Sequence, residues 1–264
     1  MHIIAVANQK GGVGKTTTSV NLSASLAMSG SRVLLIDMDP QGNATMGSGI
    51  DKNSLELSIY DWLVEEQTLR DCAKPCAGGF DLLPSNLDLT AAEVALMQSE
   101  GREYYIKNRL AQVSEYEFVL IDCPPSLNIL TVNALIAATS VLIPMQCEYY
   151  ALEGLSALLD TVEGIQQHTN PGLQIEGILR TMYDPRNSLT RDVSRQLIKF
   201  FGEKVFRTVI PRNVRLAEAP SHGLPAIMYD RTSRGAVAYM ALAGELRQRL
   251  PQKQESSFGG LTSE

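Results

Sequence analysis

The sequence predicts an α/β fold, with a mostly parallel, twisted sheet covered by helices on both faces. Two observations lead to this fold class. Short apolar runs alternate with longer stretches of helical periodicity, and the runs are continuously apolar, as in strands that are buried on both faces. The expected strands lie at 2–7, 32–37, 80–84, 118–122, 140–145, 175–183 and 205–211, and the expected helices at 15–29, 54–66, 89–98, 102–113, 150–168, 189–201 and 234–249.

The composition bounds the class of protein. The chain has 264 residues, of which 44% are apolar and 20% charged, as is typical of a soluble globular protein. We expect one domain over residues 1–250 and a flexible polar tail at 251–264, because Pro251 should end the last helix. The four cysteines suggest no disulfide framework, no signal peptide is visible, and the run "ALIAATSVLIPM" is too short to span a membrane. A cytoplasmic protein is therefore expected.

The first strand runs into a glycine-rich stretch, "ANQKGGVGKTTTSVN" at 7–21, which precedes a predicted helix. This order of strand, loop and helix is the context of a phosphate-binding loop, so we expect a fold of the P-loop NTPase kind. In such a loop, backbone N–H groups cradle phosphate oxygens, Lys15 reaches the terminal phosphates, and the Thr16 hydroxyl is placed for Mg²⁺. The expected nucleotide-binding residues here are Gln9, Lys10, Gly11, Gly12, Val13, Gly14, Lys15, Thr16 and Thr17.

Acidic residues follow two other predicted strands. "LLIDMDPQGN" at 34–43 contains Asp37 and Asp39, and "FVLIDCPPS" at 118–126 contains Asp122. Because ligands bind at the carboxyl ends of parallel strands, we expect these carboxylates beside the phosphate loop, where they hold Mg²⁺ through water or orient an attacking water. A helix cap and turn is the alternative for Asp37 and Asp39.

Five segments together resemble one protein family. "KGGVGKTT", "DMDPQGN", "IDCPPS", "CEYYALEG" at 147–154 and "VIPRNVRLAEAPSHG" at 209–223 look like motifs of the ParA (Soj-like) partition ATPases. These enzymes belong to the deviant-Walker group, which also contains MinD and the nitrogenase iron protein. The resemblance extends from residue 2 to about residue 245 and implies an ATPase with ATP and Mg²⁺ as cofactors.

The resemblance also implies roles for individual residues. Lys10, a surplus lysine in an ordinary phosphate loop, matches the signature lysine that reaches across a homodimer to the phosphates of the other subunit. Asp39 matches the acid that positions the hydrolytic water, and Gln41 and Asn43 lie in the same γ-phosphate-sensing segment. The implied catalytic residues are Lys10, Lys15 and Asp39, the implied metal set is Thr16, Asp37 and Asp122, and Pro211 and Asn213 are implied to hold adenine. The guanine-reading motif N-K-x-D is absent from the sequence. The alternative for Lys10 is an ordinary solvated surface lysine.

The implied function is DNA partition. ATP should drive dimerisation and nonspecific DNA binding on the nucleoid, and a ParB/Spo0J-like centromere-binding partner should stimulate an otherwise slow hydrolysis. Residues 180–234 hold eleven Lys and Arg but five Asp and Glu, a net charge of +6 in a chain of net charge −6. Such a stretch favours phosphate contacts without base reading. The DNA-contact candidates are Arg186, Arg191, Arg215 and Arg234.

Other readings within the same group are weaker. A MinD-like membrane protein needs a C-terminal amphipathic helix, which "PQKQESSFGGLTSE" does not resemble. An electron-transfer protein needs a pair of cluster-binding cysteines, and Cys123 has no second cysteine at suitable spacing. An ATPase that positions a cargo other than DNA stays open. Since the sequence begins at the first strand, we expect no N-terminal helix-turn-helix extension and no specific operator binding.

Overall fold

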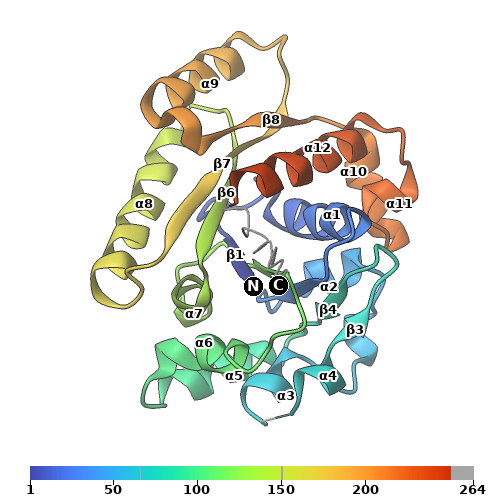
Figure 1. The fold of residues 1–264 in the computed structure, drawn as a ribbon, viewed down its shortest axis with the longest axis vertical. Coiled ribbons are helices and arrows are strands. Elements are labelled where there is room, and N and C mark those ends of the chain that lie inside the picture. Colours follow the sequence, from blue (N-terminus) through green and yellow to red (C-terminus); the bar gives the residue numbers. More distant parts are fainter. Residues whose placement is uncertain (66, 150, 251–264) are drawn as a thin grey trace, which may run out of the picture.

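The computed structural model describes residues 1–65, 67–149 and 151–250, and the predicted polar tail at 251–264 lies outside this range. The described residues form an eight-stranded sheet with the order β3-β4-β2-β5-β1-β6-β7-β8 (Figure 1). Only the short β3 (Lys74–Pro75) is antiparallel to its neighbour, β4 (Asp81–Leu83). The predicted mostly parallel α/β fold is confirmed. The other strands are β1 (His2–Val6), β2 (Val33–Asp37), β5 (Phe118–Asp122), β6 (Ser140–Gln146), β7 (Gln174–Tyr183) and β8 (Val205–Pro211).

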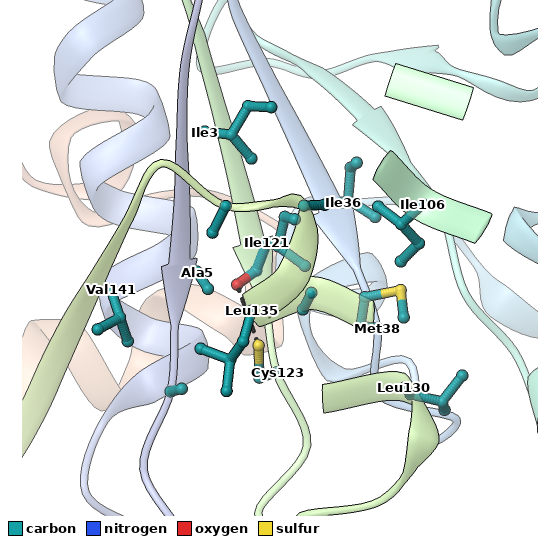
Figure 2. Packing of buried hydrophobic residues seen from close by; sticks show 14 of the residues in the cluster. Ile3, Ala5, Ile36, Met38, Ile106, Ile121, Cys123, Leu130, Leu135 and Val141 are labelled. Carbon is teal, nitrogen blue, oxygen red and sulfur yellow. Dashed lines mark hydrogen bonds between the residues drawn. The ribbon is translucent and has the colours of Figure 1, made fainter. Parts of the chain in front are cut away.

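Helices cover both faces of the sheet, because successive side chains of each strand point to opposite sides. In β1, Ile4 and Val6 face α1 (Lys15–Met28) and α12 (Arg234–Arg249), whereas Ile3 and Ala5 belong to the opposite core. That second core is covered by α5 (Leu89–Met97), α6 (Tyr105–Leu110), α7 (Ile129–Ala137) and α8 (Ala151–His168). Figure 2 shows side chains of this core packing together, including Ile36, Ile121 and Val141 from the strands and Leu130 and Leu135 from α7.

The predicted strands match the observed ones to within one residue at each end. The helices match less well. The predicted helix at 54–66 is too long, because a 3₁₀ turn at Lys52–Ser54 is followed by α3 (Ile59–Leu63), which begins at a capping box formed by Ser58 and Asp61. α7 was not predicted, since it is buried almost all round and shows no polar face to set a period. The remaining helices are α2 (Asn43–Gly47), α4 (Leu69–Cys72), α9 (Ser188–Phe201), α10 (Val214–Glu218) and α11 (Ala226–Tyr229).

The strand register places the functional candidates at one edge. Val6, the last residue of β1, is the register partner of Asp122, and Asp122 is also the partner of Asp37 in β2. The loops that follow β1, β2 and β5 therefore start side by side at the carboxyl edge of the sheet, where α/β proteins bind ligands. Cys123 is buried just beyond this edge, and the described cysteines form no disulfide.

Candidate nucleotide site

The loop between β1 and α1 is built for close backbone approach to a ligand. Gly12 and Gly14 have φ angles of 73° and 89°, which favour glycine, and Gly14 immediately precedes α1. Three hydrogen bonds hold the loop against β6 and β7. Asn8 Nδ2 donates to the Pro144 carbonyl oxygen at 2.8 Å. Thr181 Oγ1 donates to the Val13 carbonyl oxygen at 2.7 Å, and Gln146 Nε2 donates to the Gly12 carbonyl oxygen at 3.2 Å. The loop thus presents the N-terminal end of α1, which binds phosphate favourably.

Lys15 and Asp122 form the buried centre of the site. Oδ2 of the fully buried Asp122 accepts a hydrogen bond from Thr16 Oγ1 at 2.8 Å, and Oδ1 lies 2.8 Å from the Ser19 hydroxyl. Lys15 Nζ donates to the carbonyl oxygen of Lys10 at 3.3 Å. Burial lowers the pKa of Lys15, and the nearby charge of Asp122 opposes that shift. Adjacent hydroxyl and carboxylate oxygens are ligands that Mg²⁺ prefers, so Thr16 and Asp122 fit a magnesium ion.

Asp37 lies beside Asp122, but its carboxylate points toward the segment that follows β2. Oδ2 accepts hydrogen bonds from the backbone nitrogen and the hydroxyl of Thr45, both at 2.8 Å, and Oδ1 accepts one from the Asp39 nitrogen at 3.2 Å. Burial raises the pKa of Asp37 to about 6, and the Thr45 hydrogen bonds oppose this. Burial and, next, the proximity of Asp37 raise the pKa of Asp122 to about 7. The contact of Asp37 with Mg²⁺ stays a prediction.

Asp39 lies at the start of the loop that follows β2. Its Oδ1 accepts a hydrogen bond from the Gln41 nitrogen at 2.9 Å, and the side chain is only half-buried. The charge of Asp39 is close enough to Lys15 to counter the fall in that lysine's pKa. Asp39 therefore lies at the same site as Lys15 and Asp122, which agrees with the sequence expectation for its position but does not test its role.

A cavity of about 420 Å³ adjoins the loop and contains the expected adenine-holding residues. Gly14 and Thr17 line it from the loop side, and Pro211 and Asn213 line it from the segment after β8. Asn213 Oδ1 is buried without a hydrogen-bond partner among the described residues. An unpaired buried carbonyl oxygen is costly, so this acceptor could be matched by a ligand that carries an N–H donor. Met182, which also lines the cavity, is the one non-glycine described residue with a positive φ, at 48°.

The second lysine of the loop points elsewhere. Lys10 Nζ donates to Glu148 Oε2 at 2.6 Å, and the two side chains are 42% and 47% exposed. Lys15, in contrast, is 7% exposed, and its Nζ donates inward to the Lys10 carbonyl oxygen. The two lysines of the loop therefore occupy different environments, one at the buried centre and one at the surface.

The four arginines proposed for DNA follow the carboxyl ends of β7 and β8, whose last residues are register partners. Within the described residues, Arg191 on α9 donates only to backbone carbonyl oxygens, and Arg234 is exposed at the start of α12. Arg186 is paired with Asp184 at 2.8 Å, and Arg215 is paired with Glu218 at 2.8 Å and Asp230 at 3.3 Å. The last two arginines thus have part of their charge neutralised within the chain.

Not every arginine of the basic stretch lies on the surface. Arg180 is buried, and its guanidinium donates to the Ser194 hydroxyl at 2.8 Å and to the carbonyl oxygen of Phe206 at 2.8 Å. It joins β7, α9 and β8 and adds no exposed positive charge. The net charge of +6 over residues 180–234 therefore overstates the charge that the surface of this stretch presents.

Comparison with known proteins assigns the chain to a family. A family model described as an AAA domain matches residues 1–175. The sporulation initiation inhibitor protein Soj of Bacillus subtilis is 54% identical over 246 residues, which cover 92% of this chain and 97% of Soj. The chain belongs to the ParA/Soj family of chromosome-partitioning ATPases. The chromosome partitioning protein ParA of Caulobacter vibrioides is 47% identical over 258 residues, covering 96% of this chain and 97% of that protein.

Solved structures agree with this membership of the ParA/Soj family. Cobyrinic acid a,c-diamide synthase of Mycobacterium smegmatis, crystallised with bound ADP and magnesium, has a TM-score of 0.82 and 39% identity, and covers 94% of each chain. The cell division ATPase MinD of Pyrococcus furiosus has a TM-score of 0.76 and 25% identity, over 94% of this chain and 98% of that one. The P-loop ATPase fold predicted from the sequence is confirmed.

Several polar residues of the site were not found from the sequence. Ser19 holds Asp122, Glu148 pairs with Lys10, and Thr45 and Ser85 contact the loop after β2. Only Ser19 carries a sequence signal, since it follows Lys15 by one helical turn and so lies on the same face of α1. Within residues 1–65, 67–149 and 151–250, no three His, Cys, Asp or Glu residues are grouped as a metal site, and no helix is long and apolar enough to cross a membrane.

Proposed function

We propose that this ParA/Soj-family ATPase is a nucleotide-gated dimer, in which Lys10 of each subunit completes the site of the other. The observation that carries the proposal is the separation of the two loop lysines. Lys15 is buried and close enough to Asp122 to feel its charge, so it serves the nucleotide of its own subunit. Lys10 is at the surface in an exposed ion pair with Glu148, from which a facing subunit can recruit it.

Within one subunit, the described side chains divide the work. Thr16 and Asp122 hold Mg²⁺, which neutralises charge on the phosphates. Lys15 contacts the terminal phosphates from beneath, while the N-terminus of α1 contacts them through backbone N–H groups. Asp39, close to Lys15, orients the attacking water. Lys10 of the facing subunit supplies the positive charge that many other P-loop enzymes take from an arginine finger.

Adenine specificity is assigned to the cavity beside the loop. The buried and unpaired Oδ1 of Asn213 accepts a hydrogen bond from the exocyclic amino group of adenine, and Pro211 packs against the base. Guanine carries an oxygen acceptor at the corresponding position, which would face the same carbonyl oxygen of Asn213. ATP is therefore favoured over GTP.

The variant Lys10→Ala tests the dimer. It should still bind a fluorescent ATP analogue, because Lys15 and Asn213 are intact, but it should remain a monomer with ATP and Mg²⁺ and lose hydrolysis. Lys107→Ala is the control, because Lys107 is an exposed lysine on α6, outside the phosphate loop and the segment 39–45. Wild-type dimerisation and turnover in Lys10→Ala would overturn the proposal.

We further propose that the dimer binds DNA without sequence preference through Arg186, Arg191, Arg215 and Arg234, and that it associates with the nucleoid. Support comes from the net positive charge of residues 180–234 and from the exposure of all four arginines. Two subunits double the phosphate contacts and steepen the salt dependence of binding. The pair Arg191→Glu with Arg215→Glu should abolish ATP-dependent DNA binding at moderate salt, whereas Arg70→Glu, an exposed arginine on α4, should not. Binding that ignores salt concentration would contradict the proposal.

Slow intrinsic hydrolysis and stimulation by a ParB/Spo0J-like centromere-binding partner complete the proposal. The support is family membership alone. Turnover should be measured with the protein by itself, with DNA, with the partner, and with both. A rate as fast without the partner as with it would remove the partner from the cycle.

A further inference from the structure

A buried polar cluster lies next to Asp39 and is not used by the proposed cycle. It consists of Asp37 at the end of β2, Thr45 in α2 and Ser85 in the loop between β4 and α5, and all three are fully buried. Buried polar side chains are retained only where they are hydrogen-bonded, and here every partner lies inside the cluster or on the segment 39–45.

Hydrogen bonds connect the cluster in one chain. Thr45 Oγ1 donates to Asp37 Oδ2 at 2.8 Å and accepts from the backbone nitrogen of Ser85 at 2.9 Å. The single proton and a lone pair of this hydroxyl are thus both used. The Thr45 nitrogen also donates to Asp37 Oδ2 at 2.8 Å. Three separate elements of the fold therefore meet at one threonine side chain.

The same cluster holds the backbone of Asp39 from both sides. The Asp39 nitrogen donates to Asp37 Oδ1 at 3.2 Å, and the Asp39 carbonyl oxygen accepts from Ser85 Oγ at 2.9 Å. The side chain of Asp39 has no such support among the described residues, where its one hydrogen bond is with the Gln41 nitrogen in the same turn. The position of the carboxylate is therefore set through its backbone.

The segment 39–45 packs closely against the loop that carries Ser85. Gly42 has a φ of 60°, and a Cβ atom there would lie 2.7 Å from the Ser85 carbonyl oxygen. The Gly42 nitrogen also donates to the Asp39 carbonyl oxygen at 2.9 Å. Two backbones that pack this closely transmit a displacement of one to the other.

We propose that Asp37, Thr45 and Ser85 are positioning residues that form a clamp on the segment 39–45 and fix Asp39 for hydrolysis. This rests on the proposed role of Asp39 toward the attacking water. It assigns Asp37 to the clamp in place of a magnesium contact. Misplacement of a positioned group by about 1 Å costs on the order of a hundred-fold in rate, so the clamp should act on turnover more than on nucleotide affinity.

Ser85→Ala is the first test, with Ser48→Ala as its matched control. Ser48 is a buried serine just past α2 whose hydroxyl has no hydrogen-bond partner within the described part of the chain, so its removal breaks no hydrogen bond seen there. In nucleotide-free protein, Ser85→Ala should speed amide hydrogen exchange across residues 39–45, and Ser48→Ala should not. With ATP, kcat of Ser85→Ala should fall roughly ten- to a hundred-fold while the Kd of a fluorescent ATP analogue changes less than about two-fold. Equal exchange rates or equal kcat values in the two variants would overturn the clamp.

Thr45 provides a rescue test that a general loss of stability would not reproduce. Thr45→Ser keeps the hydroxyl and should keep wild-type exchange and kcat, whereas Thr45→Val removes the hydroxyl at similar volume and should behave as Ser85→Ala does. Loss of kcat in Thr45→Ser as deep as in Thr45→Val would refute the role of this hydroxyl. Asp37→Asn should leave unchanged the Mg²⁺ concentration that gives half-maximal binding of the ATP analogue. If this concentration rises as much as it does in Asp122→Asn, Asp37 is a magnesium contact and not part of the clamp.

Failure of the clamp and failure of the proposed function give different results. If the wild-type protein does not hydrolyse ATP with DNA and partner present, the proposed function fails, and the amide exchange comparison in nucleotide-free protein still decides whether the clamp exists. If the wild-type protein hydrolyses ATP and the variants match their controls, the clamp alone is refuted.

Discussion

The ion pair between Lys10 and Glu148 should restrain dimerisation, and Glu148→Gln should release it. In the single chain, Lys10 Nζ lies 2.6 Å from Glu148 Oε2. If Lys10 turns to the nucleotide of a facing subunit, this pair must break once in each subunit. Glutamine keeps the shape of the side chain but removes its charge, so the variant lowers the cost of freeing Lys10.

The magnitude follows from exposure. The two side chains are 42% and 47% exposed, and such pairs contribute about 0.2–1 kcal/mol because water and salt screen them. Two pairs per dimer give about 0.4–2 kcal/mol, which lowers the dimer dissociation constant by about two- to thirty-fold. This gain in dimer affinity should shrink as the salt concentration rises, because salt already screens the Lys10–Glu148 pair that the substitution removes.

Sedimentation velocity with Mg²⁺ and a non-hydrolysable ATP analogue measures this constant directly. We would compare the wild type with Glu148→Gln at about 50 mM and about 300 mM NaCl, where the Debye length differs by more than two-fold. Glu203→Gln is the control, because Glu203 is exposed and makes no ion pair among the described residues. A dimer of Glu148→Gln that is no tighter than wild type at low salt would show that Lys10 is not restrained by Glu148, and the reasoning would fail.

Three other predictions concern the buried groups of the molecule. The pKa of Asp122 is about 7 in the folded protein, against a usual 3.8, so between these pH values the folded state binds more protons than the unfolded state. Wild-type stability, measured as Tm, should therefore fall as pH rises from about 4 to about 7. Asp122→Asn should lack the part of this fall in Tm that Asp122 causes. Asn213→Ala should weaken ATP binding about five- to ten-fold by calorimetry, since it removes one hydrogen bond of about 1 kcal/mol, and should narrow the preference for ATP over GTP. Gly223→Ala should lower the free energy of unfolding in urea by about 2–4 kcal/mol, because φ is +64° and the new Cβ atom would lie 2.5 Å from Gly49 Cα; Gly244→Ala, in open space on α12, should not destabilise the protein.

Much of the site was predictable because parallel strands end at a common edge. Lys15 and Asp122 lie far apart in the sequence, yet each follows a continuously apolar run, and the topology brings the ends of such runs together. That reasoning needs only the positions of strands, which hydrophobic patterns report well. It places residues to within a loop, and it led to the phosphate loop and both acidic segments, whereas the segment after β8 was implied only by the family resemblance.

The direction in which a side chain points at the end of a strand cannot be predicted from the sequence. Asp37 and Asp39 are two residues apart and looked equivalent as magnesium or water contacts. In the structure, Asp37 is buried under the segment 39–45 and bonded to Thr45, whereas Asp39 is half-exposed beside Lys15. Contacts such as Ser85 with Asp39 or Lys10 with Glu148 also join residues that no local pattern links. Helix α7 was missed for a related reason, since complete burial removes the periodicity on which prediction depends.

The electrostatics of the site link these residues to the nucleotide. Asp37 and Asp122 are neighbouring buried carboxylates with pKa values of about 6 and about 7, and Lys15 is the nearby cation that favours ionisation of Asp122. Metal binding requires an ionised carboxylate, so a magnesium ion at Asp122 would oppose the upward shift of its pKa. The charge of Mg²⁺ at Thr16 and Asp122 would also act on the neighbouring carboxylate of Asp37, which is hydrogen-bonded to the segment 39–45.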